Sequence, residues 1–115
     1  MSPRYVPDRG HLIWLNFNPQ LGHEQTGRRP AMVLSPARYN GTTDLAIICP
    51  ITSRVKGYPF EVRISARTVS GVVLADAVRS VDWVQRKAEF IEAAPPEALI
   101  KTFQTLCRLI DPYEL

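Results

Sequence analysis

The chain has 115 residues, of which 45% are hydrophobic and 22% are charged. This composition and length are typical of one globular domain, so we expect a single domain over residues 1–115 and exclude a second full one. The net charge of +3 is uneven, because residues 4–87 hold 12 basic and 6 acidic side chains whereas residues 88–115 hold two and five. Most of the basic residues are arginine, whose planar guanidinium suits phosphate, so the composition favours a polyanionic partner.

The two cysteines lie in no pattern that holds zinc. Cys49 is in an apolar run and Cys107 in the last amphipathic stretch, so we expect two buried, reduced thiols and neither metal nor cofactor. The chain starts without an apolar targeting segment, and no apolar run approaches the roughly 18 to 20 residues of a membrane span. We therefore expect a cytoplasmic protein that does not enter the membrane.

Short apolar stretches separated by prolines and turn residues predict strands. In chain order they are His11–Phe17, Ala31–Leu34, Leu45–Ile51, Phe60–Ile64, Gly71–Ala75, Val78–Val84 and a short edge at Ala88–Ile91. Helical spacing appears after Pro95-Pro96-Glu97, in Leu99, Ile100, Phe103, Leu106, Cys107 and Ile110. The pattern predicts a mostly β fold, a barrel or sandwich, with a C-terminal amphipathic helix that covers an open end of the barrel.

A long polar loop is predicted between the first two strands, over residues 18–30. It brings an imidazole, an acid and two guanidinium groups close together in sequence, namely His23, Glu24, Arg28 and Arg29. Two interpretations are open. Either these are solvated loop charges, or they form a cluster able to bind an anion and to transfer a proton.

A second group of polar residues follows the predicted strand Leu45–Ile51. Thr52 and Ser53 close this strand, and Arg54 and Lys56 come directly after them. Hydroxyls and cations at a strand end either hold a phosphate or cap backbone groups at a turn. Asp76, close to Arg79 in sequence, is equally open between a binding role and a paired structural carboxylate.

Familiar catalytic motifs are missing from the sequence. It contains no Walker loop, no HExxH, no GxSxG and no closely spaced carboxylates for two metals. The chemistry that remains is what arginine, a carboxylate, a hydroxyl and histidine perform without a metal. RNA strand scission by the substrate's own 2′-hydroxyl is one such reaction.

The run Glu-Gln-Thr-Gly-Arg-Arg-Pro at residues 24–30 resembles the MazF/PemK toxins of bacterial toxin–antitoxin systems, which are sequence-selective, metal-independent endoribonucleases. The likeness covers nearly the whole chain. Further matching segments are residues 5–8 with Gly10, 12–14, 18–19, 22–25, 33–36, 39–40, 50–53, 56–62, 71–76 and 79–83.

This resemblance implies the SH3-like β-barrel of the MazF/Kid/CcdB-like plasmid toxins and a symmetric homodimer. Its implied substrate is single-stranded mRNA, cut to 2′,3′-cyclic phosphate and 5′-hydroxyl ends, with inhibition of translation and growth as the result. The implied partner is a MazE-like antitoxin whose acidic, flexible tail occupies the RNA groove, which suits the basic charge of residues 4–87.

Matched residue by residue, the resemblance makes Arg29, Thr52 and Glu24 the catalytic residues. The expected RNA-binding residues are His23, Gln25, Arg28, Ser53, Arg54, Lys56, Asp76 and Arg79. His23 stands where many relatives have serine, so an imidazole is available to hydrogen-bond RNA or to join the proton transfer. Ala77 stands where the family often has glutamine, which alters the contacts near Asp76.

Two rival interpretations belong to other functional classes. One is a non-catalytic protein of the same fold, which is either a toxin that poisons a protein such as DNA gyrase and depends on the C-terminal helix, or an inactive RNA binder. The other is a structural SH3-like interaction module, in which the charges of residues 18–30 stay idle. An activity that requires Arg29 and Thr52 would distinguish the ribonuclease from both.

Overall fold

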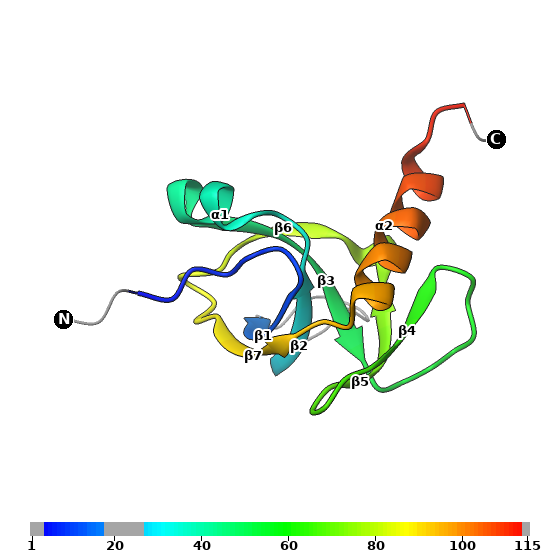
Figure 1. The fold of residues 1–115 in the computed structure, drawn as a ribbon, viewed down its shortest axis with the longest axis horizontal. Helices are drawn as coiled ribbons and strands as arrows, with labels where there is room; N and C mark the ends of the chain where they lie inside the picture. The colour runs from blue at the N-terminus through cyan, green and yellow to red at the C-terminus, as the bar shows by residue number, and fades with distance from the viewer. Residues whose placement is uncertain (1–3, 18–26, 114–115) are drawn as a thin grey trace.

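The structure is a computed structural model and describes residues 4–17 and 27–113. Its strands are β1 (His11–Phe17), β2 (Gly27–Val33), β3 (Leu45–Thr52), β4 (Glu61–Ser65), β5 (Ser70–Leu74), β6 (Arg79–Asp82) and β7 (Glu89–Ala93). Its helices are α1 (Ala37–Thr43), the 3-10 turn η1 (Ala75–Ala77) and α2 (Pro96–Ile110). Figure 1 shows a strongly curled sheet with α2 along one side of it.

The strands form an antiparallel sheet in the order β4-β5-β3-β2-β1-β7, and β6 also pairs with β3. The long strand β3 joins the two parts of this sheet. Its first half, from Leu45 to Ile48, pairs with β6, whereas Ile51 and Thr52 pair with β5. The candidate residue Thr52 therefore lies in the part of β3 that pairs with β5, beyond the part that pairs with β6.

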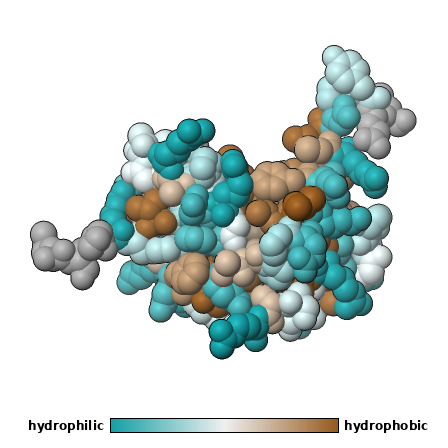
Figure 2. All heavy atoms as spheres, in the orientation of Figure 1, coloured by the Kyte–Doolittle hydropathy of each residue, from teal (hydrophilic) through white to brown (hydrophobic). Residues whose placement is uncertain are grey.

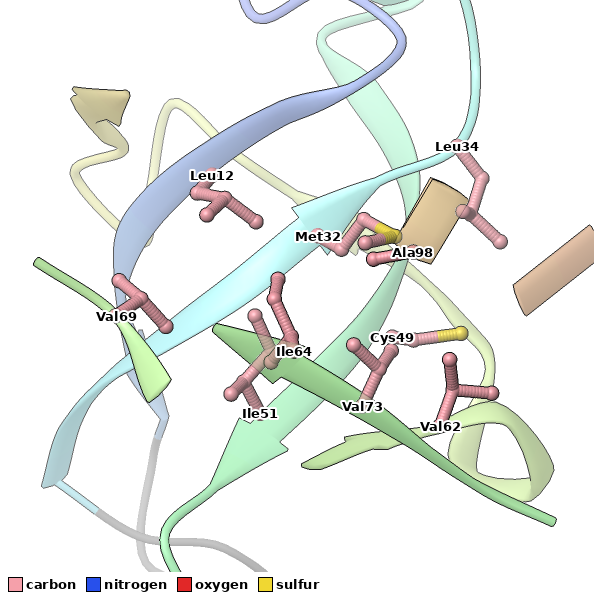
Figure 3. Close-up of a cluster of buried hydrophobic side chains, with 10 residues drawn as sticks. All are labelled: Leu12, Met32, Leu34, Cys49, Ile51, Val62, Ile64, Val69, Val73 and Ala98. Carbon is pink, nitrogen blue, oxygen red and sulfur yellow. The ribbon is translucent and has the colours of Figure 1, made fainter. Parts of the chain in front are cut away.

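Both faces of the curled sheet are covered by apolar side chains. One cluster contains Leu12, Met32, Cys49, Ile51 and further buried residues (Figure 3). The other lies on the opposite face of the same strands and contains Ile13, Leu15 and Phe17 of β1. Two buried faces explain why β1 is apolar at successive positions, since a strand with one wet face alternates apolar and polar residues.

Strand β2 begins at Gly27, four residues earlier than the sequence analysis expected. Arg28 and Arg29 therefore lie in a strand, and the prediction that placed them in a loop is wrong. The reason is the partner strand, because β1 pairs with β2 from Phe17↔Gly27 onward. Pro30 is tolerated because β2 pairs with β3 only from Ala31, so the missing N–H of Pro30 breaks no bond on that side.

Helix α1 was not predicted, since its sequence contains glycine and two threonines and has no apolar stripe. Tertiary hydrogen bonds around the fully buried Asn40 hold it in place. The Asn40 side-chain amide donates to the carbonyls of Pro7 and Ser35, and the Trp83 indole donates to the carbonyl of Asn40 at 2.9 Å. The helix is thus specified by contacts distant in sequence.

Helix α2 matches the prediction over most of its length. Proline at its start and Glu97 in its first turn suit a helix N-terminus. Leu99, Phe103 and Leu106 of the predicted apolar face pack against the first core cluster, to which Ala98 also belongs.

The distal end of α2 extends past the sheet, where Figure 2 shows hydrophobic atoms at the surface. Ile100 is 57% exposed and Ile110 is 68% exposed. Cys107 is exposed as well, so the expectation of two buried thiols is wrong for it. Cys49 is buried as predicted, and burial, together with the charge of Asp76, raises the pKa of its thiol to about 12. Within residues 4–17 and 27–113, no helix is long and apolar enough to span a membrane.

The imidazole of His11 gives the first testable prediction. Its Nδ1 accepts a hydrogen bond from the backbone N–H of Asp8 at 3.2 Å and lies 2.8 Å from the Tyr5 hydroxyl, so protonation of Nδ1 removes the acceptor of the Asp8 N–H. Burial lowers the pKa of His11 from its ordinary value of 6.5, against the opposing charge of Asp8. The unfolded chain therefore binds this proton more readily, and we expect the free energy of unfolding to fall as the pH drops below 6.5.

Chemical denaturation between pH 5 and 8 measures this effect, with His11→Asn as the matched variant. We expect a slope that His11→Asn removes and that does not exceed about 1.4 kcal/mol per pH unit, the limit for one proton. Equal slopes in the two proteins would contradict the assignment to His11.

Candidate active site

A small pocket of about 190 Å³ opens where the ladder between β2 and β3 ends. Its walls come from β1, β2, the end of β3 and the turn between β4 and β5, and its lining residues are Trp14, Arg29, Pro30, Ile51, Thr52, Ser53, Thr68, Val69 and Ser70. The ladder stops at Ala31↔Pro50. Pro30 and Pro50 have no N–H to continue it, so the two strands can separate at this point.

Arg29 and Thr52 lie on the two strands that border this opening. The pairs Ala31↔Pro50, Met32↔Cys49 and Val33↔Ile48 set the register of β2 on β3. Side chains alternate with period two, so Arg29 points to the same face of the sheet as Ala31, and Thr52 to the same face as Pro50. Both line the pocket that opens beyond this last pair. Two residues far apart in sequence thus reach one pocket.

The hydroxyl of Thr52 has a defined orientation. It is half-buried, and its Oγ1 accepts a hydrogen bond from the backbone N–H of Arg54 at 3.1 Å. Because this bond uses an oxygen lone pair, the hydroxyl hydrogen remains to be donated to an acceptor in the pocket. Arg29 is exposed and supplies a permanent positive charge to the same pocket.

Arg28, the neighbour of Arg29, points to the opposite face of β2. Its guanidinium donates to the Asn16 side chain at 2.7 Å, to the Lys87 carbonyl at 3.0 Å and to the Glu89 carboxylate at 2.8 Å. These bonds tie the end of the β1–β2 hairpin to the chain around β7. The intramolecular role of Arg28 was not visible in the sequence, where it was grouped with the RNA-binding residues.

The segment from Ser53 to Phe60 follows the pocket and is exposed and basic. Ser53, Arg54 and Lys56 lie on it, as the sequence analysis expected. The Glu61 carboxylate accepts the backbone N–H groups of Lys56 and Gly57, which fixes the segment near its middle. Tyr58, 52% exposed, stacks on Phe60 with 5.2 Å between ring centroids. Trp14 is an aromatic residue that lines the pocket and that the sequence did not indicate as part of the site.

Comparison with known proteins adds to this geometry. Residues 8–110 match the family model described as PemK-like, MazF-like toxin of type II toxin–antitoxin system. The chain belongs to the PemK/MazF toxin family. The endoribonuclease toxin MazF of Escherichia coli strain K12 is 50% identical over 99 residues, which cover 86% of this chain and 89% of that relative.

Solved structures of PemK/MazF proteins share the fold. MazF from Deinococcus radiodurans superposes with a TM-score of 0.88 at 60% identity, over 93% of this chain and 98% of that one. A MazE–MazF complex from the same organism gives a TM-score of 0.84 at 54% identity, over 94% and 98% of the two chains. These matches confirm the predicted fold class and the resemblance.

Two further residues that the PemK/MazF resemblance assigns to RNA binding, Asp76 and Arg79, are not among the lining residues of this pocket. Asp76 is exposed in η1, and Arg79 in β6 holds its guanidinium over the Phe17 ring at 5.9 Å. His23, Glu24 and Gln25 lie outside the described residues. In the described part of the chain, no three His, Cys, Asp or Glu side chains are placed to share a metal ion.

Proposed function

We propose that this chain is the toxin of a type II toxin–antitoxin pair and a metal-independent, sequence-specific endoribonuclease that acts on single-stranded mRNA. The observation that carries this proposal is the meeting of Arg29 and Thr52 in one pocket. Family membership and the endoribonuclease relatives support it. Cleavage of mRNA by such an enzyme inhibits translation and growth.

The chemistry follows from what the two side chains can do to a phosphodiester. The 2′-hydroxyl of the RNA attacks the adjacent phosphorus, the new 2′-O–P bond forms and the P–O5′ bond breaks. Negative charge builds up on the non-bridging oxygens in between. Arg29 neutralises this charge and Thr52 donates a hydrogen bond to one of these oxygens, so both act most strongly on the transition state.

Two protons must also move. A base takes the proton of the 2′-hydroxyl, and an acid delivers one to the leaving 5′ oxygen, which leaves a 2′,3′-cyclic phosphate and a 5′-hydroxyl. We assign Glu24 to proton transfer or to the orientation of Arg29, with His23 as a further candidate. The role of Arg29 is electrostatic, because a guanidinium group keeps its proton in proteins and is a poor proton donor.

RNA binding is assigned to the surface beside the pocket. Arg54 and Lys56 are exposed there and can contact phosphates, while Ser53 lines the pocket itself. The stacked pair Tyr58 and Phe60 and the Trp14 ring are suited to contact unpaired bases. Bases in a duplex are already stacked on one another, which favours a single-stranded substrate.

The proposed partners are an antitoxin similar to MazE and a second copy of the chain. A MazF relative is seen in complex with MazE, and an acidic antitoxin tail suits the basic residues of the pocket surface. The exposed apolar residues at the end of α2, Leu109 and Ile110, support association between protein chains. We place the protein in the cytoplasm, where mRNA is accessible.

Cleavage of a long defined RNA in EDTA tests the proposed function. We expect discrete cuts whose 5′ fragments end in a 2′,3′-cyclic phosphate. A matched oligonucleotide with 2′-deoxy substitution at the mapped cut should stay intact, because it lacks the nucleophile. Cuts only with added metal, or cuts in the 2′-deoxy substrate, would overturn the mechanism. No cleavage of varied RNAs would favour the toxin that poisons a protein such as gyrase.

Replacement of Thr52 isolates the contribution of its hydroxyl. Thr52→Val keeps the side-chain shape and removes the donor, so we expect kcat/KM for RNA cleavage to fall about 10²-fold, the effect of losing one oxyanion donor. Thr52→Ser keeps the hydroxyl and should retain most of the activity. Equal losses in the valine and serine variants would contradict the hydrogen-bond role.

A further inference from the structure

One carboxylate holds the turn that joins β4 to β5. Glu92 in β7 accepts the backbone N–H of Arg67 at 3.1 Å through Oε1, and those of Thr68 at 2.8 Å and Val69 at 3.0 Å through Oε2. Three successive N–H groups of a turn form a concave site for an anion, and here the anion is a side chain of the same protein. The contact joins segments more than 20 residues apart in sequence, which is the reason no sequence motif indicated it.

The same turn is a wall of the candidate active site. Thr68, Val69 and Ser70 line the pocket together with Arg29 and Thr52. Val69 is buried in the first core cluster, whereas Thr68 and Ser70 are exposed. The side of the turn away from the core therefore faces any substrate that occupies the pocket.

We propose that Glu92 is a positioning residue for the RNA substrate: it fixes the turn 67–69, which forms one wall of the pocket that Arg29 and Thr52 also line. This inference rests on the proposed ribonuclease function and deepens it. A turn held in one conformation presents Thr68 and Ser70 to the RNA without an ordering cost at binding.

Glu92 keeps its charge at neutral pH. Desolvation opposes ionisation of the carboxyl, but the three backbone hydrogen bonds and the nearby Arg67 guanidinium outweigh it, so the pKa of Glu92 is lowered. The three hydrogen bonds of the ionised Glu92 carboxylate are therefore present at neutral pH.

The β4–β5 hairpin is also held by hydrogen bonds that do not involve Glu92. The Ala66 N–H donates to the Val69 carbonyl at 2.8 Å, and β4 pairs with β5 from Glu61↔Leu74 to Ser65↔Ser70. Loss of Glu92 should then loosen the turn and leave the ladder in place. This separates positioning from general stabilisation.

Steady-state cleavage and direct binding test the proposal on the full chain. The variants are Glu92→Ala, Glu92→Gln and the control Glu97→Gln, which removes an equal charge from an exposed site in the first turn of α2. We expect KM to rise about tenfold in Glu92→Ala with kcat within about twofold of wild type, as for a lost substrate-orienting contact. Glu92→Gln keeps one acceptor oxygen, so its KM should lie between those of wild type and Glu92→Ala. The KM of Glu97→Gln should match that of wild type.

Binding of a 2′-deoxy-substituted oligonucleotide, followed by fluorescence anisotropy, should give the same order of Kd values. Amide hydrogen exchange supplies a local readout, with faster exchange expected at Thr68 and Val69 in Glu92→Gln and unchanged protection in β1 to β3. Uniform loss of protection, or an unchanged KM with a lowered kcat, would overturn the positioning role.

If Glu92→Ala does not fold, the KM, Kd and exchange rates of Glu92→Gln alone decide. A wild-type chain that neither cleaves nor binds RNA would instead overturn the proposed function, and this inference with it.

Discussion

Arg29→Ala should reduce kcat/KM for RNA cleavage by about 10³-fold while the protein remains folded. Arg29 reaches the pocket from β2, and it is exposed, so truncation leaves no cavity in the core. The variant lacks the positive charge that stabilises the transition state, in which the negative charge on the non-bridging phosphate oxygens is greatest. Cleavage of a short fluorogenic RNA in EDTA measures the loss.

Arg29→Lys should recover little of this activity, because a lysine ammonium cannot reproduce the two parallel hydrogen bonds of a guanidinium to phosphate. Arg38→Ala is the matched control, since Arg38 is exposed on α1, outside the pocket. Equal activity of Arg29→Ala and Arg38→Ala would remove Arg29 from the catalytic machinery.

Gly71→Ala should destabilise the protein by about 2–4 kcal/mol, the range for combined overpacking and backbone strain. Gly71 has φ of +137°, and a Cβ at this position would collide with the carbonyl oxygen of Thr52 and lie 3.0 Å from its carbonyl carbon. Because the obstacle is backbone, β5 or the end of β3 must move. Thermal unfolding should show a Tm lowered by about 10–20 °C, and cleavage measured well below that Tm should also be reduced.

Gly57→Ala separates the two causes. Gly57 also has a positive φ, +83°, but a Cβ there would meet no atom within 4 Å. We expect this variant to be destabilised by the backbone strain alone, about 1 kcal/mol. Similar Tm values for the two variants would mean that strain, and not the contact with Thr52, makes glycine necessary at position 71.

Elements whose pattern is local were predictable from the sequence. The strand His11–Phe17 has the predicted bounds, and the C-terminal helix follows from the helical spacing after Pro95. Elements that depend on distant partners were not. Helix α1 needs Asn40 and its tertiary hydrogen bonds, and the start of β2 is set by pairing with β1. Exposure of Cys107 depends on how far α2 extends past the sheet.

The candidate site also contains residues that could be predicted from the sequence and contacts that could not. The resemblance named Arg29 and Thr52, and the structure brings both to one pocket. It could not show that Arg28 bonds to Glu89, or that Glu92 holds the turn 67–69, because these contacts link residues far apart in sequence. The assignment of Glu24 to proton transfer stays a prediction.

The hydrogen bonds of Arg28 have a consequence for which arginine enters the pocket. Arg28 pairs with Asn16 and Arg29 with Leu15 across the β1–β2 ladder. A slip of β2 by one residue would turn every side chain to the other face and exchange the two arginines. The slipped pairing would break the bonds of Arg28 to Asn16 and Glu89. The hydrogen bonds of Arg28 thus fix the register of β2 on β1, and this register decides that Arg29, and not the chemically identical Arg28, reaches the pocket.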